Sequence, residues 1–517
     1  MGIPSYFNHV LQNHRNIIIE TSSMKCDYLF IDSNSLIYDV IHELECSSIN
    51  DTEIYDKVFS KMIELYKSCN PNILMYVAFD GIPPLPKIYQ QRSRRYKSSF
   101  TKKILDQKKN TWNTNRITPG TDFMNNLDDY ITNKIKSYPK IMFNGSKNQG
   151  EGEHKICNFI RTHIKQKQSS IMIYGLDADL IMLGLLLVCD DYQIYLHKET
   201  RHFTYIKQID PNETYYFDLC KMGDQLHNIM EQEDNASSIF DYIVICFMCG
   251  NDFLPHLPSI NIRFDGINTL IDHYKKMNSE KNHPFIDKTN RQIIWSNLRE
   301  MFSHLKTDET DRIIQNIKTK SKQRRYQHPK DFEEKLNILP CFDMTKDMYL
   351  MNNIESYNQF CLGTQKVDQI CIDYLKCFEW TWNYYQGNLI SNSIVYKHSH
   401  GPLFNDLLNY IPAFDSENFI DLQPKNVIEY DMNDEIQSLA QLYFVIPYEE
   451  HSKIIPQDLY NETSDRVYQK FPQLKVKTNH IDFDYLLCKY FWESHVIIQD
   501  VDIFALDEIL QSSSISI

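Results

Sequence analysis

The stretch IMIYGLDADLIML at residues 171–183 decides the fold that we expect for this chain. It begins with an apolar run that reads as a buried strand, and Gly175 ends that run. Asp177 and Asp179 follow at once, and the next apolar run, residues 180–188, has the length of a helix. In an open α/β sheet, ligands bind at the edge where strands hand over to helices. Two carboxylates there suit a hard divalent cation such as Mg²⁺, whereas capping the helix needs only one.

Two earlier segments repeat this pattern of an apolar strand followed by an aspartate. Residues 28–31 form an apolar run that Asp32 ends, and residues 73–79 form a second run that Asp80 ends. The carboxyl ends of parallel strands meet at one edge of a sheet, so these acids should lie close to the first pair. Chance would have to place a carboxylate at every strand exit, and the pattern therefore favours a metal site.

Three further acids are candidates for the same site. Glu151 and Glu153 form another closely spaced pair within QGEGEHKI, and Asp252 follows the apolar segment 239–249, whose length favours a helix. His154 would also suit zinc, but acids dominate the set, which favours Mg²⁺ or Mn²⁺. We interpret His154 as a hydrogen-bonding residue at the start of a helix.

A basic segment at residues 85–110 begins directly after the strand that ends at Asp80. Charge runs usually form the solvated face of a helix. Here the position beside an acidic edge favours phosphate binding, because a cationic helix holds phosphate and Arg94 and Arg95 can fork onto its oxygens. Lys87 belongs to the same segment.

Length and composition limit the remaining possibilities. The 517 residues allow about three average domains or one large catalytic unit with appendages. The net charge of −14 argues against a protein that coats nucleic acid non-specifically. The 13 scattered cysteines are typical of free thiols in a reducing compartment. No signal peptide or run of about 20 apolar residues stands out, so we expect an intracellular protein, in the cytoplasm rather than the nucleus, with no membrane partner.

The chain contains the strings MGIPSYF, IDSNSLIY, FDGIPPLPKIYQQRSRRYKSS, ITPGTDFM, GEGEHKICNFIR, IYGLDADLIMLGL and CFMCGNDFLPHLPSI. FEWTWNYYQGN and QSLAQLYFVIP follow in the second half. Together these strings resemble the eukaryotic 5′→3′ exoribonucleases of the Xrn family. The resemblance covers most of residues 1–285 strongly and about 345–500 weakly.

The resemblance implies an α/β fold with a mostly parallel sheet flanked by helices, similar to flap-nuclease and PIN-like nuclease cores. A mainly helical second conserved block is expected to pack against this core. The expected divisions are a catalytic nuclease domain at 1–285, a charged helical linker at 286–345, a second block completing the active-site pocket at 346–510, and a frayed tail at 511–517.

The resemblance also implies a reaction and its residues. We expect processive hydrolysis of 5′-monophosphorylated single-stranded RNA to nucleoside 5′-monophosphates, in mRNA or general RNA decay, with two Mg²⁺ or Mn²⁺ ions about 4 Å apart. The implied catalytic metal ligands are Asp32, Asp80, Glu151, Glu153, Asp177, Asp179 and Asp252. The implied pocket for the 5′-phosphate consists of Lys87, Gln91, Arg94 and Arg95.

The chain departs from the family in its expected base-stacking clamp. Tyr38 stands where the family usually has a histidine that stacks on the terminal base, and tyrosine can also stack. The family's tryptophan on the other side of that base is absent from the stretch after Gly387, which reads NLISNSIVYKHSHGP. The chain is also short for the family and lacks the C-terminal modules of its long cytoplasmic members. Compact forms occur in large DNA viruses, which fits the composition and would imply a viral protein of the host cytoplasm or the virion.

Two alternatives stay open. A structure-specific DNA flap nuclease would share the acidic site, but such enzymes usually follow the last acids with a glycine-rich helix-hairpin-helix, where this chain has FLPHLPSINI. An inactive RNA-binding scaffold would be expected to have lost metal ligands, and all seven acids are present here.

Overall fold

The structure is a computed structural model that describes residues 5–20, 24–44, 50–105, 112–175, 177–198, 215–279, 283–325, 344–388, 393–411, 435–488 and 490–512. Some expectations fall outside these residues: the start of MGIPSYF, residues 326–343 of the expected linker, residues 389–392 after Gly387, and 513–517 of the tail. Within the described part, no helix has both the length and the apolar character that crossing a membrane requires.

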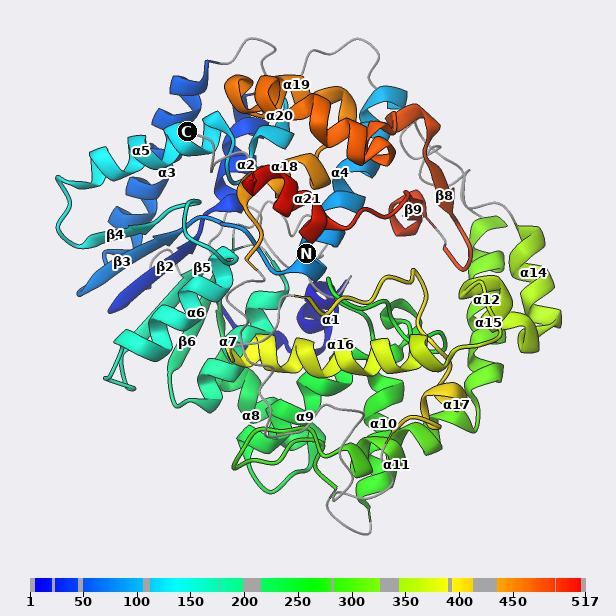
Figure 1. Ribbon diagram of the computed structural model, residues 1–517. Helices are drawn as coiled ribbons and strands as arrows, with labels where there is room; N and C mark the ends of the chain where they lie inside the picture. The colour runs from blue at the N-terminus through cyan, green and yellow to red at the C-terminus, as the bar shows by residue number, and fades with distance from the viewer. Residues whose placement is uncertain are drawn as a thin grey trace.

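A seven-stranded sheet forms the first half of the molecule, with strand order β1-β7-β6-β5-β2-β3-β4 (Figure 1). The strands are β1 Ile18–Glu20, β2 Tyr28–Asp32, β3 Leu74–Ala78, β4 Ile141–Asn144, β5 Ser170–Tyr174, β6 Gln193–Lys198 and β7 Tyr215–Asp218. Strands β6, β5, β2, β3 and β4 run parallel, and β7 lies antiparallel between β1 and β6. The predicted fold class, a mostly parallel sheet flanked by helices, is confirmed.

Helices cover both faces of this sheet because successive side chains of a strand point to opposite sides. On β2, Leu29 and Ile31 join the core under α2, α3 and α5, whereas Phe30 joins the core under α6, α7, α8 and α9. These helices are α2 Asn34–Leu44, α3 Asp51–Cys69, α5 Asp122–Ile135, α6 Gly152–His163, α7 Asp179–Cys189, α8 Leu219–Met230 and α9 Asn235–Phe247. The apolar segment before Asp252 is therefore a helix, as its length predicted.

Strand register sets where the chain leaves the sheet. Strand β2 is paired with β3 on one side and β5 on the other, with Asp32 opposite Ala78 and Ile31 opposite Tyr174. The segments that follow all three strands consequently begin at the same edge of the sheet, which is the position predicted for the acids at the strand exits.

The second half of the chain is mainly helical (Figure 1). Its helices are α10 Gly266–Asn278, α11 Trp295–Lys306, α12 Glu309–Arg325, α14 Met344–Asn352, α15 Tyr357–Cys361, α16 Asp368–Gln386, α17 Phe404–Leu407, α18 Ser438–Val445, α19 His451–Ile454, α20 Gln457–Lys470 and α21 Ile503–Gln511. Helix α11 lies in the segment expected to be a linker, yet Leu298, Met301, Phe302 and Leu305 are buried in the same core as α9. The domain limits themselves stay predictions.

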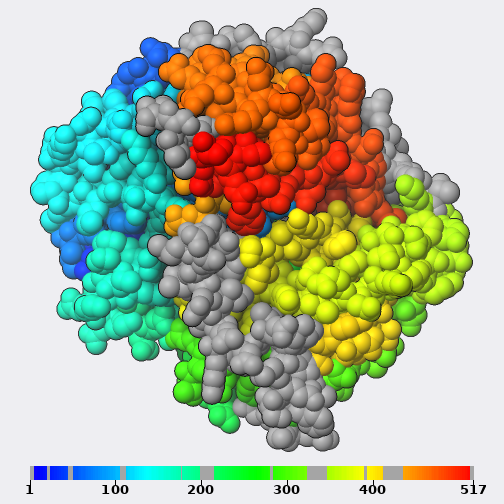
Figure 2. All heavy atoms as spheres, viewed as in Figure 1, coloured from blue at the N-terminus to red at the C-terminus, as the bar shows by residue number. Residues whose placement is uncertain are grey.

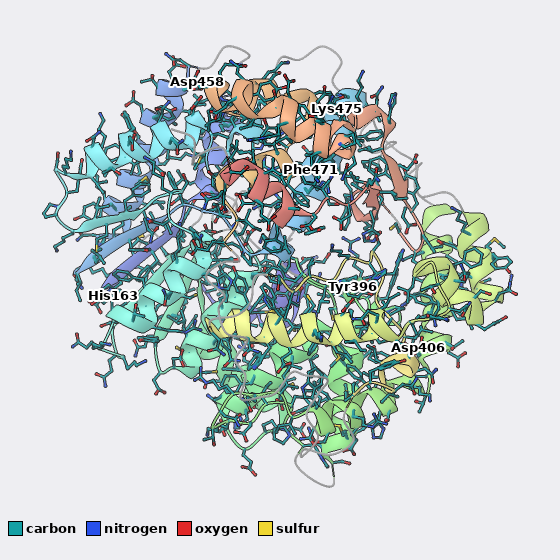
Figure 3. All side chains as sticks on the ribbon, in the orientation of Figure 1. His163, Tyr396, Asp406, Asp458, Phe471 and Lys475 are labelled. Atoms are coloured by element: carbon teal, nitrogen blue, oxygen red, sulfur yellow. The ribbon has the colours of Figure 1, made fainter. Side chains whose placement is uncertain are left out.

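Two helices of the second half, α16 and α18, pack against helices of the first half. Helix α16 crosses beside α7, and the following segment folds back on it, with the ring of Tyr396 meeting that of Tyr374 edge to face at 5.2 Å (Figure 3). Helix α18 packs on α4, Leu85–Leu105, and with α19–α21 it forms the orange to red part of the surface (Figure 2). Strands β8 Asp482–Asp484 and β9 His495–Ile497 form a small antiparallel sheet nearby.

Candidate active site

The acids expected at the strand exits converge at the edge of the sheet. Asp32 ends β2 and is buried, Asp80 follows β3, and Asp177 lies between β5 and α7. Carboxylate oxygens of Asp32, Asp177 and Glu153 lie within 4.8 Å of one another. Three segments that are distant in sequence thus meet in one cluster, as the parallel strand order requires.

The N-terminus of α6 brings Glu151 and Glu153 into this cluster. An α-helix N-terminus presents unpaired N–H groups that favour carboxylates, and the N–H of Gly152 donates to Oδ1 of Asp80 at 2.6 Å. A Cβ atom on Gly152 would stand 2.7 Å from Oδ1 of Asp32. The glycine is therefore needed for close approach of the helix to the strand exits.

Burial and mutual repulsion make the cluster electrostatically unfavourable without a cation. Burial, reinforced by Asp80 and Asp177, raises the pKa of Asp32 well above its ordinary value. Burial and then Asp252 raise the pKa of Asp179 to about 7. A bound divalent cation would relieve this repulsion by favouring the ionised carboxylates.

Two buried oxygens of the cluster have no hydrogen-bond partner among the described residues. They are Oε2 of Glu153 and Oδ1 of Asp179, in side chains that are 6% and 3% exposed. A buried carboxylate oxygen without a donor is costly unless a cation compensates it. Carboxylates dominate the donor set, although a ring nitrogen of His154 lies within 4.8 Å of carboxylate oxygens of Glu151 and Glu153. The set therefore fits a hard divalent cation such as Mg²⁺ or Mn²⁺.

Lys87 lies inside the acidic cluster. Its Nζ is 2.6 Å from Oε1 of Glu151 and 2.7 Å from Oδ2 of Asp252, and all three side chains are buried. Burial alone would raise the pKa of Asp252, but the ammonium of Lys87 overcomes this and holds that pKa below its ordinary value. The resemblance assigned Lys87 to the phosphate pocket; here its ammonium contacts two of the acids.

The other three residues of the expected phosphate pocket follow Lys87 along α4. Arg94 is exposed and makes no hydrogen bond or ion pair within the described residues. The guanidinium of Arg95 donates to Oδ1 of Asn115 at 2.9 Å and to the carbonyl of Ile117 at 3.1 Å. Gln91 accepts a hydrogen bond from Gln441 of α18 at 3.2 Å. Among the described residues, Arg95 and Gln91 therefore have hydrogen-bond partners, and Arg94 has none.

Tyr38, the expected base-stacking residue, lies half-buried on α2 against the core under that helix. It is within electrostatic reach of the guanidinium of Arg95, and burial lowers the pKa of that guanidinium. The stretch where the family's second stacking residue would lie begins in residues 389–392, outside the described part of the chain. The structure therefore does not identify a residue for the other side of the base.

Sequence reasoning missed two residues that contact the acids. The hydroxyl of Tyr384 on α16 donates to Oε2 of Glu151 at 2.6 Å, and the side-chain amide of Asn34 donates to Oδ2 of Asp80. His154 was interpreted as a hydrogen-bonding residue; instead its ring stacks on that of Tyr384 at 3.7 Å. Asn34 lies in IDSNSLIY and Tyr384 in FEWTWNYYQGN, two of the strings that resemble the family. The local sequence pattern does not indicate which carboxylate either side chain contacts.

Comparison with known families gives two matches. The model described as the N-terminus of XRN 5′-3′ exonucleases matches residues 1–199, and the model described as the Xrn1 helical domain matches residues 232–339. Together the two matches cover more than half of the chain.

Curated relatives match about half of the chain. The 5′-3′ exoribonuclease 1 of Saccharomyces cerevisiae is 31% identical over 316 residues, which cover 53% of this chain and 21% of the yeast protein. The 5′-3′ exoribonuclease 2 of Gallus gallus is 27% identical over 370 residues, covering 54% of this chain and 39% of the relative. The matches thus span much less than the full length of these relatives.

Two solved structures of nucleases are distantly similar to this chain. The catalytic core of Rad2 in complex with a DNA substrate matches 68% of this chain and 81% of its own at 11% identity, with a TM-score of 0.35. The D15 flap endonuclease of bacteriophage T5 matches 56% of this chain and 92% of its own at 11% identity, with a TM-score of 0.28. Likenesses of this strength carry no argument about function.

Proposed function

The chain belongs to the Xrn family of 5′-3′ exonucleases, and we propose that it is a processive 5′→3′ exoribonuclease. Its substrate in this proposal is single-stranded RNA with a 5′-monophosphate, which it hydrolyses to nucleoside 5′-monophosphates in RNA decay. The observation that carries the proposal is one cluster of buried carboxylates at the sheet edge with the basic helix α4 against it. Lys87 of α4 contacts Glu151 and Asp252, and Arg94 lies seven residues, about two turns, further along the same helix.

The carboxylates hold the metal in this proposal. The residues that would bind it are Asp32, Asp80, Glu151, Glu153, Asp177, Asp179 and Asp252. Bound Mg²⁺ or Mn²⁺, as a pair of ions, would supply Lewis acidity toward the scissile phosphate and lower the pKa of the attacking water. The helix N-terminus at Gly152 and the amide of Asn34 hold Asp80 in place for that task.

The basic helix selects the end of the substrate. Arg94 has a guanidinium without a partner among the residues that the structure describes, and a guanidinium is well suited to hold a terminal phosphate by two hydrogen bonds. Gln91 and Arg95 flank it along α4 and would complete the pocket. A phosphate held there sets the distance to the first phosphodiester at the acids, so that a capped end would not fit and cleavage would release one nucleotide at a time.

Base stacking by Tyr38 would orient the terminal nucleotide. Its half-buried side chain is within electrostatic reach of Arg95, which supports a position beside the pocket proposed for the phosphate. Aromatic stacking on a base is tolerant of sequence, which suits an enzyme that degrades RNA irrespective of its sequence.

A digestion time course with Mg²⁺ tests the proposal. The substrates are single-stranded RNAs with a 5′-monophosphate, a 5′-hydroxyl or a cap, a matched 5′-monophosphate DNA, and a branched DNA flap. The double variant Asp177→Asn/Asp179→Asn serves as the inactive control. Rapid loss of the monophosphate RNA alone, with mononucleotide products, is the expected result.

Two other outcomes have definite meanings. Equal cleavage of every end, or internal cuts at the flap, would replace the exoribonuclease proposal with a flap nuclease. RNA binding without cleavage in Mg²⁺ and in Mn²⁺ would identify an RNA-binding scaffold instead.

A further inference from the structure

We infer that Tyr384 is a positioning residue that orients Glu151 for metal binding, and that the second block completes the metal site through it. The inference rests on the proposed function only in taking Glu151 as a metal ligand. Tyr384 comes from α16, far from α6 in the sequence, and its hydroxyl reaches Oε2 of Glu151 at 2.6 Å.

Glu151 has one donor on each of its oxygens. Nζ of Lys87 is 2.6 Å from Oε1, and the hydroxyl of Tyr384 is 2.6 Å from Oε2. The residue is 4% exposed, so bulk water contributes little to its orientation. Two donors on opposite oxygens fix the rotation of a carboxylate, and without the phenol Oε2 would face the neighbouring acids without a donor.

The ring of Tyr384 is held by residues next to two of the acids. His154, the residue after Glu153, stacks on it with centroids 3.7 Å apart and planes 29° apart. Phe253, the residue after Asp252, meets it edge to face at 5.5 Å and 88°. The ring therefore packs against both chain segments that carry the acids bridged by Lys87.

Helix α16 holds the Asp252 segment at further points. The ring of Trp380 stacks on Tyr384 at 4.9 Å and meets Phe253 edge to face at 5.1 Å. One and two turns earlier, Cys377 contacts the carbonyl of Phe253 at 3.7 Å and Tyr374 donates to the carbonyl of Pro255 at 3.1 Å. Helix α16 is thus anchored to the Asp252 segment at several points, and Tyr384 carries the contact from this helix to Glu151.

The hydroxyl and the ring can be separated by mutation. Tyr384→Phe removes the donor to Glu151 and keeps the aromatic stack, so the variant should fold. Tyr242→Phe is the matched control, because Tyr242 is buried and its hydroxyl has no hydrogen-bond partner within the described residues. Glu151→Gln and the double variant with Tyr384→Phe complete a double-mutant cycle.

The primary readout is binding of Mn²⁺ to the full chain without RNA, by calorimetry and by electron paramagnetic resonance. Losing the partner of a metal-binding side chain typically costs about tenfold or more in metal affinity. We therefore expect Tyr384→Phe to weaken Mn²⁺ binding by about tenfold. In the Glu151→Gln background the same change should have no further effect. If RNA is cleaved, activity should recover at raised metal concentration, which a general loss of folding would not produce.

Other results overturn the inference. Mn²⁺ affinity within twofold of the wild type, or an equal loss in Tyr242→Phe, would show that the hydroxyl does not position Glu151. If the effects of Tyr384→Phe and Glu151→Gln on Mn²⁺ affinity were additive, the hydroxyl would likewise not act through Glu151. These measurements need no RNA, so they test the inference independently of the proposed function. If Tyr384→Phe weakens Mn²⁺ binding but the wild type does not cleave RNA, the inference holds and the exoribonuclease proposal is rejected.

Discussion

The Nζ atom of Lys87 lies 2.7 Å from Oδ2 of Asp252, inside the cluster that the sequence predicted from its acids. The same ammonium lies 2.6 Å from Oε1 of Glu151. It supplies a positive charge between two carboxylates that would otherwise repel each other. Because a divalent cation would serve the same purpose, Lys87 and the metal should compete for these acids.

Replacing Lys87 with methionine should strengthen metal binding. The change removes a positive charge beside two metal-binding acids, so Mn²⁺ affinity measured by calorimetry should rise by about tenfold. Without metal, the unpaired acids should lower the free energy of unfolding by about 3 kcal/mol. Added Mn²⁺ should then raise the Tm of the variant more than that of the wild type.

Lys103→Met is the control for this change, because Lys103 is an exposed lysine of the same helix paired with Glu449. It should alter neither Mn²⁺ affinity nor stability by a measurable amount. If Lys87→Met instead bound Mn²⁺ more weakly than the wild type, Lys87 would be organising the acids and not competing for them.

Arg94 and Arg95 should respond differently to alanine substitution. Arg94 is exposed and uncommitted within the described residues, so Arg94→Ala should leave Tm unchanged and reduce the preference for 5′-monophosphate over 5′-hydroxyl RNA by at least tenfold. Arg95 donates to Asn115 and Ile117, so Arg95→Ala should also lower stability, by roughly 1–3 kcal/mol. Competition between the two RNAs and thermal unfolding measure these effects, and an unchanged preference in Arg94→Ala would remove Arg94 from the pocket.

Gly152→Ala should disable the site while leaving the fold intact. The added Cβ would stand 2.7 Å from Oδ1 of Asp32, so either the carboxylate or the start of α6 must move. A displacement of this size should cost at least 100-fold in kcat. Gly223→Ala on α8 is the matched control, since its Cβ would meet aliphatic side-chain carbons, the nearest being Cδ1 of Ile239 at 3.1 Å and Cγ1 of Val188 at 3.8 Å, and no acid. Equal activity of the two variants would contradict the close approach of α6 to β2.

Glu309→Gln should change the pH dependence of stability. Burial raises the pKa of Glu309 from its ordinary 4.5 to about 7, outweighing hydrogen bonds from the N–H groups of Phe404 and Asn405. The folded chain therefore binds this proton more tightly than the unfolded chain does. The resulting stabilisation is present below about pH 4.5 and is lost as the pH rises through about 7.

Glutamine cannot titrate, so the stability of the variant should not fall over this range. Between pH 4.5 and 8 its free energy of unfolding should therefore rise relative to that of the wild type by roughly 3 kcal/mol. Urea unfolding of both proteins at several pH values measures this difference. Parallel pH profiles would show that Glu309 is ionised at the same pH in the folded and unfolded chains.

Most of the acidic cluster was accessible from the sequence because its signals are local. Asp32 and Asp80 each follow a short apolar strand, and parallel pairing of these strands puts their ends at one edge. The spacing of Glu151 and Glu153 gave a further local signal. The stacking of His154 on Tyr384 was not predicted, because Tyr384 comes from a helix more than two hundred residues away.

The sequence by itself determined the mostly parallel sheet and the strand exits where the carboxylates gather. Apolar runs, strand breaks and acids are short-range features that one stretch of chain contains completely. Only the tertiary structure decided that Lys87 bridges Glu151 and Asp252 and that Tyr384 donates to Glu151. These contacts depend on how α4 and α16 pack around the sheet edge, and packing of distant helices has no counterpart in any local pattern of residues.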